Sequence, residues 1–286
     1  MVDHKDIVSF VKPASLNEAV ELLAKNDYFI MAGGTDAMVQ YKGTPGYPVE
    51  INKSVLFIHH LDELKQVKRQ GGDIVIGACA TFSELLSNDY VPTVLKGAIK
   101  QIASPAIRNR GTIGGNICNA SPAGDTLPLL YIYDAHIVLQ SKCGRRLISI
   151  KNFIKGPRKI DLAKGELIVE IILPEVNEKT TLYRFEKVGS RKADAISKLS
   201  MAGARRVENN VIKEMKIVFG AVGATMVYDK AVEEELVGER FPLQEEILNK
   251  TLKRYSDIIN PIDDQRSTAD YRKKVALNLL RDFCSL

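Results

Sequence analysis

Residues 111–126, GTIGGNICNASPAGDT, are the most informative segment of this 286-residue chain. The segment holds so many Gly, Asn and Ser residues that we expect neither a regular strand nor a helix, although apolar residues flank it. A buried irregular backbone needs partners for its N–H and C=O groups, and a polar ligand is one source of them. A compact surface loop that satisfies its own backbone is the alternative.

A second glycine-rich segment, AGGTD, occupies residues 32–36. It lies between a strand predicted at residues 28–31 and a short helix predicted at residues 37–41, an order that is typical of an anion-binding site. A tight turn without a ligand explains the two glycines equally well. Together, the two segments favour a long ligand with its phosphates on backbone N–H donors. Thr35 then adds a hydroxyl donor, and Asp125 accepts from sugar or ribityl hydroxyls.

The composition is that of a globular protein, with 45% hydrophobic and 26% charged residues, and the length predicts two domains or three small ones. The net charge of +5 is spread along the chain, which gives little support to nucleic-acid binding. No apolar run approaches the ~20 residues of a membrane span, and the N-terminal residues lack the apolar segment of a signal peptide. We therefore expect a cytoplasmic protein.

Motifs for independent chemistry are missing from the sequence. The four cysteines, Cys79, Cys118, Cys143 and Cys284, have none of the close spacings of zinc or iron–sulfur sites, and we expect no metal site in this chain. The HExxH, GxSxG, Walker and GxGxxG motifs are also absent, so no catalytic residue is assigned.

The pattern of the remaining sequence predicts an α+β protein. A capping box at residues 15–18 begins a helix over residues 16–25, and a short strand is expected at residues 49–52. We then predict hairpins at 64–69/73–78 and 136–140/145–150, a helix at 92–103 and a strand at 166–173. A domain boundary follows Pro174; beyond it we predict strands at 181–188, 197–208 and 211–220 and helices at 229–236, 243–258 and 269–283.

Three segments give the chain a specific resemblance: MAGGTD at residues 31–36, TIGGNICNASPAGDTLPLL at 112–130 and SRKADAISK at 190–198. In this order they resemble the FAD-binding subunit of molybdenum hydroxylases, the family that includes the flavoprotein subunits of xanthine, nicotinate, quinoline and carbon monoxide dehydrogenases. The resemblance implies an FAD-binding fold of the vanillyl-alcohol-oxidase (PCMH) type in two subdomains, residues 1–54 and 55–176. A C-terminal domain of a three-stranded antiparallel sheet and helices, residues 177–286, completes it.

The resemblance also implies which residues bind FAD. Residues 30–37 and 112–116 bind the pyrophosphate, and Asp125 binds sugar or ribityl hydroxyls. A mobile loop at residues 190–198 lies beside the isoalloxazine ring, with Ile196 covering the ring and Asp194 as a gate near the electron acceptor; a solvated charged turn is the alternative for this loop. The implied set is Ile30, Met31, Ala32, Gly33, Gly34, Thr35, Asp36, Ala37, Ile102, Thr112, Ile113, Gly114, Gly115, Asn116, Asp125, Ile168, Lys187 and Ile196.

The function implied by the resemblance is electron transfer in a multi-subunit molybdenum hydroxylase. FAD is expected to be non-covalent, because no histidine lies in either glycine-rich segment. The implied partners are a large molybdopterin subunit and a small subunit with two [2Fe–2S] clusters, in a dimer of heterotrimers. Electrons pass from these clusters through FAD to NAD+ or another acceptor. The alternative is a stand-alone nucleotide- or flavin-binding protein or oxidase that is not coupled to molybdenum.

Overall fold

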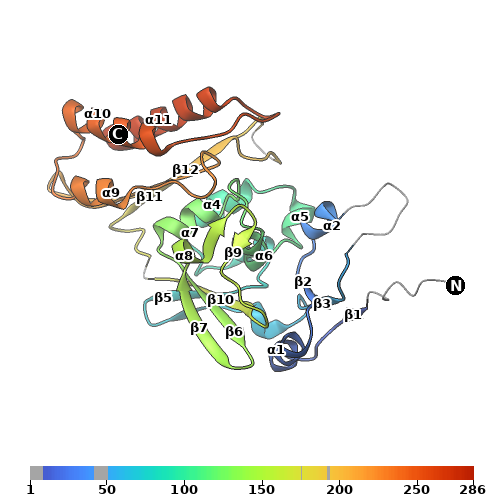
Figure 1. The fold of residues 1–286 in the computed structure, drawn as a ribbon. Helices are drawn as coiled ribbons and strands as arrows, with labels where there is room; N and C mark the ends of the chain where they lie inside the picture. Colours follow the sequence, from blue (N-terminus) through green and yellow to red (C-terminus); the bar gives the residue numbers. More distant parts are fainter. Residues whose placement is uncertain (1–8, 42–50, 175, 192–193) are drawn as a thin grey trace.

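The computed structural model describes residues 9–41, 51–174, 176–191 and 194–286. Within these ranges the strands form three sheets of three or more strands and one two-stranded sheet, with helices packed against them (Figure 1). The predicted α+β class is therefore confirmed. Residues 49–50 of the strand expected at 49–52 and residues 192–193 of the segment at 190–198 lie outside the described residues.

A small parallel sheet lies nearest the N-terminus, with strands in the order β1 (Phe10–Val11), β3 (Val55–Phe57) and β2 (Phe29–Met31). Helix α1 (Leu16–Lys25) begins as predicted, with Ser15 Oγ accepting the Glu18 N–H at 3.2 Å. Strand β3 begins directly after the predicted division between residues 54 and 55, and it pairs with β1 on one side and β2 on the other, so it belongs to the first sheet. The division into three domains stays a prediction.

The second sheet is antiparallel and has the order β4 (Val67–Gln70), β5 (Asp73–Gly77), β10 (Leu167–Leu173), β6 (His136–Ser141) and β7 (Gly144–Ser149). Both predicted hairpins are present, and β10 joins them. The short elements around this sheet are η1 (Asp62–Leu64), α3 (Phe82–Ser87), α4 (Thr93–Lys100), α5 (Pro105–Arg108), α7 (Leu127–Ile132), α8 (Ile150–Phe153), β8 (Ile154–Gly156) and β9 (Lys159–Ile160). Apolar side chains of α3, α4, α7, α8, β8 and β9 share one core with the sheet, whereas Leu64 of η1 is buried in the core around α1.

Helix α6 (Ile113–Asn119) contradicts the prediction that residues 111–126 contain no helix. Thr112 caps its N-terminus by accepting the Gly115 N–H on Oγ1 at 3.1 Å. Ile113 and Ile117, four residues apart, are fully buried on one face. Burial of this face and the cap outweigh the helix penalty of about 1 kcal/mol for each glycine, which an argument from helix propensity alone does not capture.

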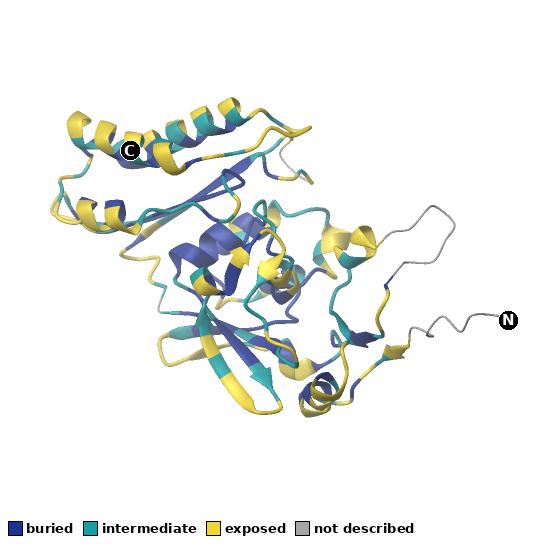
Figure 2. Ribbon diagram, viewed as in Figure 1, coloured by how far each residue is buried: buried dark blue, intermediate teal, exposed yellow. Residues whose placement is uncertain are grey.

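The third sheet is an antiparallel meander of β11 (Leu182–Val188), β12 (Leu199–Glu208) and β13 (Val211–Gly220), as predicted. The helices α9 (Lys230–Leu236), α10 (Glu245–Ile258) and α11 (Ala269–Ser285) cover one face, where the side chains are buried (Figure 2). Helix α7 packs against β12 and β13 and joins this sheet to the second one. Among the described residues, no helix combines the length and the apolar character needed to cross a membrane.

Candidate functional site

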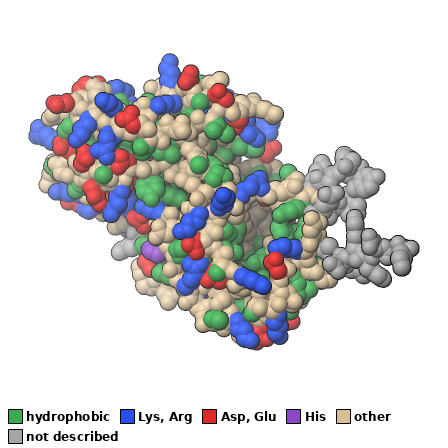
Figure 3. Space-filling model, in the orientation of Figure 1, with side chains coloured by type: hydrophobic (Ala, Val, Ile, Leu, Met, Phe, Trp, Pro, Cys, Tyr) green, Lys and Arg blue, Asp and Glu red, His purple; other side chains and the backbone are tan. Residues whose placement is uncertain are grey.

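A cavity of about 730 Å³ lies between the first sheet and helix α6. Its walls come from the turn after β2, from α2 (Ala37–Gln40), from α6 and from the segment that follows α4. Figure 3 shows a hollow on this face of the molecule, with Lys and Arg side chains around its rim. Most of the predicted site residues line it: Ile30, Met31, Ala32, Gly33, Gly34, Thr35, Asp36, Ala37, Ile102, Thr112, Gly115 and Asn116.

The turn after β2 supplies backbone donors to this cavity. The N–H groups of residues 33–36 donate to no acceptor among the described residues. Gly34 has φ +73°, a left-handed value that favours glycine. Consecutive unpaired amides in a turn of this kind form a concave anion-binding site, so the turn can hold the oxygen atoms of a phosphate group.

Gly33 brings the two glycine-rich segments into contact. A Cβ atom at this position would lie 1.9 Å from the carbonyl oxygen of Arg110 and 3.2 Å from Gly111 Cα. The first distance is far shorter than van der Waals contact, so a residue with a side chain would push the turn away from the segment that leads into α6. Glycine at this position therefore lets two distant parts of the sequence form one wall of the cavity.

The first amides of α6 are occupied within the protein. The N–H groups of residues 113–115 donate to backbone carbonyls after β5 and to Thr112 Oγ1, at distances of 2.9 to 3.1 Å. An amide with an internal partner is not free for a phosphate, so the unpaired backbone donors come from the first glycine-rich segment. The side chain of Asn116 lines the cavity, and its Oδ1 accepts from Thr126 Oγ1 at 2.5 Å. The side-chain nitrogen of Asn116 donates to no acceptor among the described residues.

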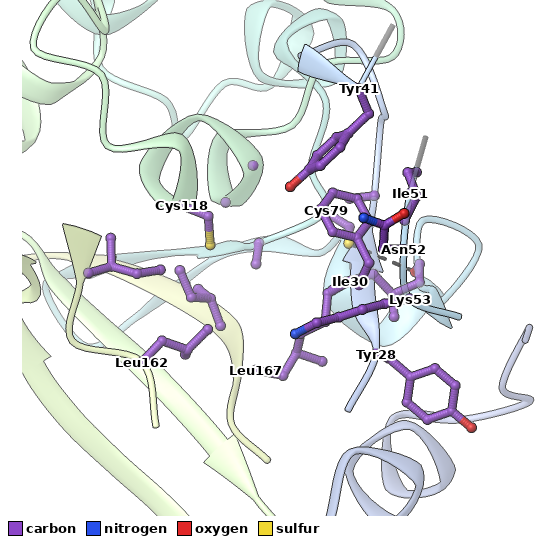
Figure 4. Close-up of a pocket in the computed structure, with 18 residues that line it drawn as sticks. Tyr28, Ile30, Tyr41, Ile51, Asn52, Lys53, Cys79, Cys118, Leu162 and Leu167 are labelled. Atoms are coloured by element: carbon purple, nitrogen blue, oxygen red, sulfur yellow. Dashed lines mark hydrogen bonds between the residues drawn. The ribbon is translucent and has the colours of Figure 1, made fainter. Parts of the chain in front are cut away.

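An apolar pocket of about 500 Å³ adjoins the larger cavity and shares part of its wall. Tyr41 and Cys118 project into it from the end of α2 and from α6 (Figure 4). The Cys118 side chain is exposed to this pocket, and the partial loss of hydration beside the protein raises the pKa of its thiol to about 12, so the thiol stays protonated at neutral pH. Two predicted residues, Gly114 and Ile168, line this pocket and not the larger cavity.

Asp125 lies in a buried polar cluster next to the cavity. Its Oδ2 accepts from Lys187 Nζ at 2.7 Å and its Oδ1 accepts from Ser197 Oγ at 2.5 Å. Lys187 Nζ also donates to Gln101 O at 2.9 Å, one residue before the cavity residue Ile102. Burial raises the pKa of Asp125, although the Lys187 ammonium and the hydrogen bonds from Lys187 and Ser197 oppose this rise. The predicted residues Asp125 and Lys187 thus form one ion pair, and Ser197 is a member that sequence reasoning missed.

Some predicted residues lie outside both cavities. Ile113 is fully buried in the core below α6. Ile196 is 55% exposed. Asp194 has φ +50°, and its carbonyl oxygen accepts from Arg191 Nε at 2.9 Å. The roles implied for these side chains stay predictions.

Several residues that line the cavity are absent from the predicted set, among them Arg158, Gln40 and Asn119. Arg158, with a left-handed φ of +58°, donates its backbone N–H to Ala120 O at 3.2 Å, and it lines the cavity near the end of α6. Gln40 Nε2 donates to Asn119 Oδ1 at 3.0 Å, which links α2 to α6. The Gly-Pro-Arg-Lys sequence at residues 156–159 is a turn signal, but no local signal places that turn beside α6.

The geometry fits a dinucleotide cofactor. A turn of unpaired amides suits a diphosphate, the adjoining apolar pocket suits a planar ring, and the glycine at residue 33 permits the close packing between the two segments. The fold and the site are therefore those of an α+β protein with a cavity between its first sheet and α6 that suits a nucleotide cofactor.

Comparison with known proteins identifies the family. Residues 6–176 match the FAD binding domain in molybdopterin dehydrogenase, and residues 184–285 match the CO dehydrogenase flavoprotein C-terminal domain. The chain therefore belongs to the family of FAD-binding subunits of molybdopterin dehydrogenases. The predicted FAD cofactor and oxidoreductase class are confirmed at this level.

Individual relatives are similar in sequence to nearly the whole chain. The glyceraldehyde dehydrogenase medium chain of Sulfolobus acidocaldarius is 33% identical over 274 residues, which cover 93% of each chain. The xanthine dehydrogenase FAD-binding subunit of Escherichia coli O157:H7 is 29% identical and covers 93% of this chain and 91% of its own length. A solved structure of carbon monoxide dehydrogenase from Hydrogenophaga pseudoflava matches with a TM-score of 0.86 at 28% identity, covering 96% of this chain and 94% of the other. The predicted fold type is confirmed.

Proposed function

We propose that this chain is the FAD-binding electron-transfer subunit of a multi-subunit molybdenum hydroxylase. In this proposal it receives electrons from [2Fe–2S] clusters of a partner subunit and passes them to NAD+ or another acceptor. The main support within the chain is the turn at residues 33–36, whose unpaired amides lie against the segment leading into α6. When bound, FAD supplies chemistry that exchanges single electrons with iron–sulfur clusters and electron pairs with a hydride acceptor.

The residues of this chain bind and orient the cofactor in distinct ways. The amides of residues 33–36 and the Asn116 side-chain amide donate hydrogen bonds to the diphosphate. Arg158, at the edge of the same cavity, supplies a positive charge that favours this dianionic group. The apolar pocket that contains Tyr41 and Ile168 excludes water from one ring system of FAD. Asp125 would accept a hydrogen bond from a hydroxyl group of the sugar or ribityl part.

The partners implied by the sequence remain part of the proposal. The names of two relatives, medium chain and FAD-binding subunit, describe one chain of a larger enzyme. We propose a large molybdopterin subunit and a small subunit with two [2Fe–2S] clusters, assembled as a dimer of heterotrimers. That NAD+ is the electron acceptor and that the protein is cytoplasmic are also predictions made from the sequence.

Two measurements on the purified full chain test the proposal. Titration with FAD should give saturable quenching of flavin fluorescence and an absorbance ratio near one flavin per chain. A folded preparation that takes up no FAD would refute it. Affinity purification from the native host should recover chains that carry molybdenum and iron–sulfur clusters. Substrate oxidation by the chain alone, without such partners, would instead support a stand-alone oxidase.

A further inference from the structure

Two cationic side chains bind the backbone carbonyls that follow helix α4. Lys187 Nζ donates to Gln101 O at 2.9 Å. Arg108 Nη1 donates to the next two carbonyl oxygens, to Ile102 O at 2.7 Å and to Ala103 O at 2.8 Å. Cations are favourable at the C-terminal end of a helix, because the carbonyl groups there carry partial negative charge. The chain that leaves α4 is therefore held by three charge-assisted hydrogen bonds in succession.

The backbone between the two Arg108 contacts has an unusual conformation. Ala103 has φ +42°, a left-handed value that is unfavourable for a residue with a Cβ atom and persists where surrounding contacts hold it. The carbonyls of Ile102 and Ala103 belong to the peptide groups before and after the Ala103 Cα. By binding both oxygens with one nitrogen, Arg108 fixes the orientation of these two peptide groups and so stabilises the left-handed turn.

This turn begins the segment 102–111, which forms one side of the cavity. Ile102 lines the cavity at the start of the segment. Near its end, the carbonyl of Arg110 lies against Gly33, where a Cβ atom would be only 1.9 Å from the oxygen. Arg108 lies between these two points in the sequence, and its side chain returns to the start of the segment. One side chain thus links the position of Ile102 to that of the surface on which the turn after β2 packs.

We propose that Arg108 is a positioning residue for the cofactor, which holds the segment 102–111 in the conformation that binds FAD. The inference rests on the proposed function, because FAD is taken to occupy the cavity beside this segment. Arg108 itself is not among the residues that line the cavity, so it acts through Ile102 and Arg110. When only a fraction of the molecules holds the binding conformation, the apparent Kd rises in inverse proportion to that fraction.

The test uses full-length proteins with substitutions at Arg108. Arg108→Met keeps the apolar part of the side chain and removes both hydrogen bonds. Arg108→Lys keeps a single nitrogen with three donors, and both bonds of Arg108 come from one nitrogen. Lys100→Met is the matched control, because it removes a positive charge from the last turn of α4, where Lys100 is exposed. Fluorescence titration measures the Kd of FAD, and thermal melting shows that each variant is folded.

The Kd of FAD should rise about tenfold or more in Arg108→Met, as expected when about a tenth of the molecules hold the segment in place. Arg108→Lys should recover most of the affinity, and Lys100→Met should bind FAD as the wild type does. Arg108→Gln, which has a neutral donor group, provides a second measurement if Arg108→Met does not fold, and its Kd should also rise.

A second substitution tests whether Arg108 acts through the left-handed turn. Glycine adopts this conformation without strain, so Ala103→Gly should reduce the rise in Kd that Arg108→Met causes. A purely structural arginine would lower the melting temperature of Arg108→Met or Arg108→Gln and leave the Kd of FAD unchanged. That result would overturn the inference and leave the proposed function intact. Absence of FAD uptake by the wild type would instead refute the proposed function itself.

Discussion

Glu233→Gln should stabilise the protein, and the gain should increase as the pH rises. Glu233 lies on α9, is 8% exposed, and accepts the Ile217 N–H on Oε1 at 2.8 Å. Burial raises the pKa of this carboxyl from 4.5 to about 7; the hydrogen bond from Ile217 and the charges of Lys151 and Lys216 oppose the rise without cancelling it. Glutamine keeps the acceptor oxygen but removes the titrating group.

The magnitude follows from this shift. The folded state binds the Glu233 proton more tightly than the unfolded chain does, so stability from this group is full below pH 4.5 and is lost as the pH rises through about 7. At about 1.4 kcal/mol per pH unit, the shift lowers the free energy of unfolding by about 3 kcal/mol at pH 8. At pH 5 the loss is below about 1 kcal/mol. The advantage of glutamine should therefore grow by about 2 to 3 kcal/mol between pH 5 and pH 8.

The wild type and Glu233→Gln are compared by their melting temperatures, measured at constant ionic strength from pH 5 to pH 8. Since about 1 kcal/mol shifts the melting temperature of a chain of this size class by about 2 to 4 °C, the advantage of Glu233→Gln should rise by about 5 to 10 °C. Glu234→Gln is the control, because the Glu234 side chain on the same helix is 67% exposed. Its difference from the wild type should not change with pH. A difference for Glu233→Gln that is constant over this range would refute the reasoning.

Two further predictions concern the cavity. Gly33→Ala should weaken FAD binding at least tenfold, about 1.4 kcal/mol, because the new Cβ would lie 1.9 Å from Arg110 O. Fluorescence titration measures the affinity. Gly97→Ala is the control and should bind FAD as the wild type does, because a Cβ at this position meets nothing within 4 Å. Bound FAD should protect Cys118, which is exposed within the apolar pocket, from alkylation, but not Cys143, which is exposed outside it. Labelling of Cys118 that is equal with and without FAD would contradict its place in the site.

Much of the fold was predictable because its signals are local. The capping box of Ser15 and Glu18 marks the start of α1, and the glycine pair at residues 71–72 marks the β4–β5 hairpin. Helix α6 was not predictable in this way. Its stability depends on burial of Ile113 and Ile117 in a core shared with the second sheet, which is made by residues distant in the sequence.

The two glycine-rich segments show how far the sequence determines the site. Both contain adjacent glycines, yet the structure uses them differently. Residues 33–36 keep unpaired amides, whereas Gly114 donates its N–H to Ala78 O and would place a Cβ 2.6 Å from that same oxygen. The pattern of glycines is similar, but the partner of each amide depends on which strand passes beside it. Substitutions in the first segment should therefore displace the amides that are available to the cofactor. A substitution at Gly114 should first displace α6 from the second sheet and affect the cofactor only through that displacement.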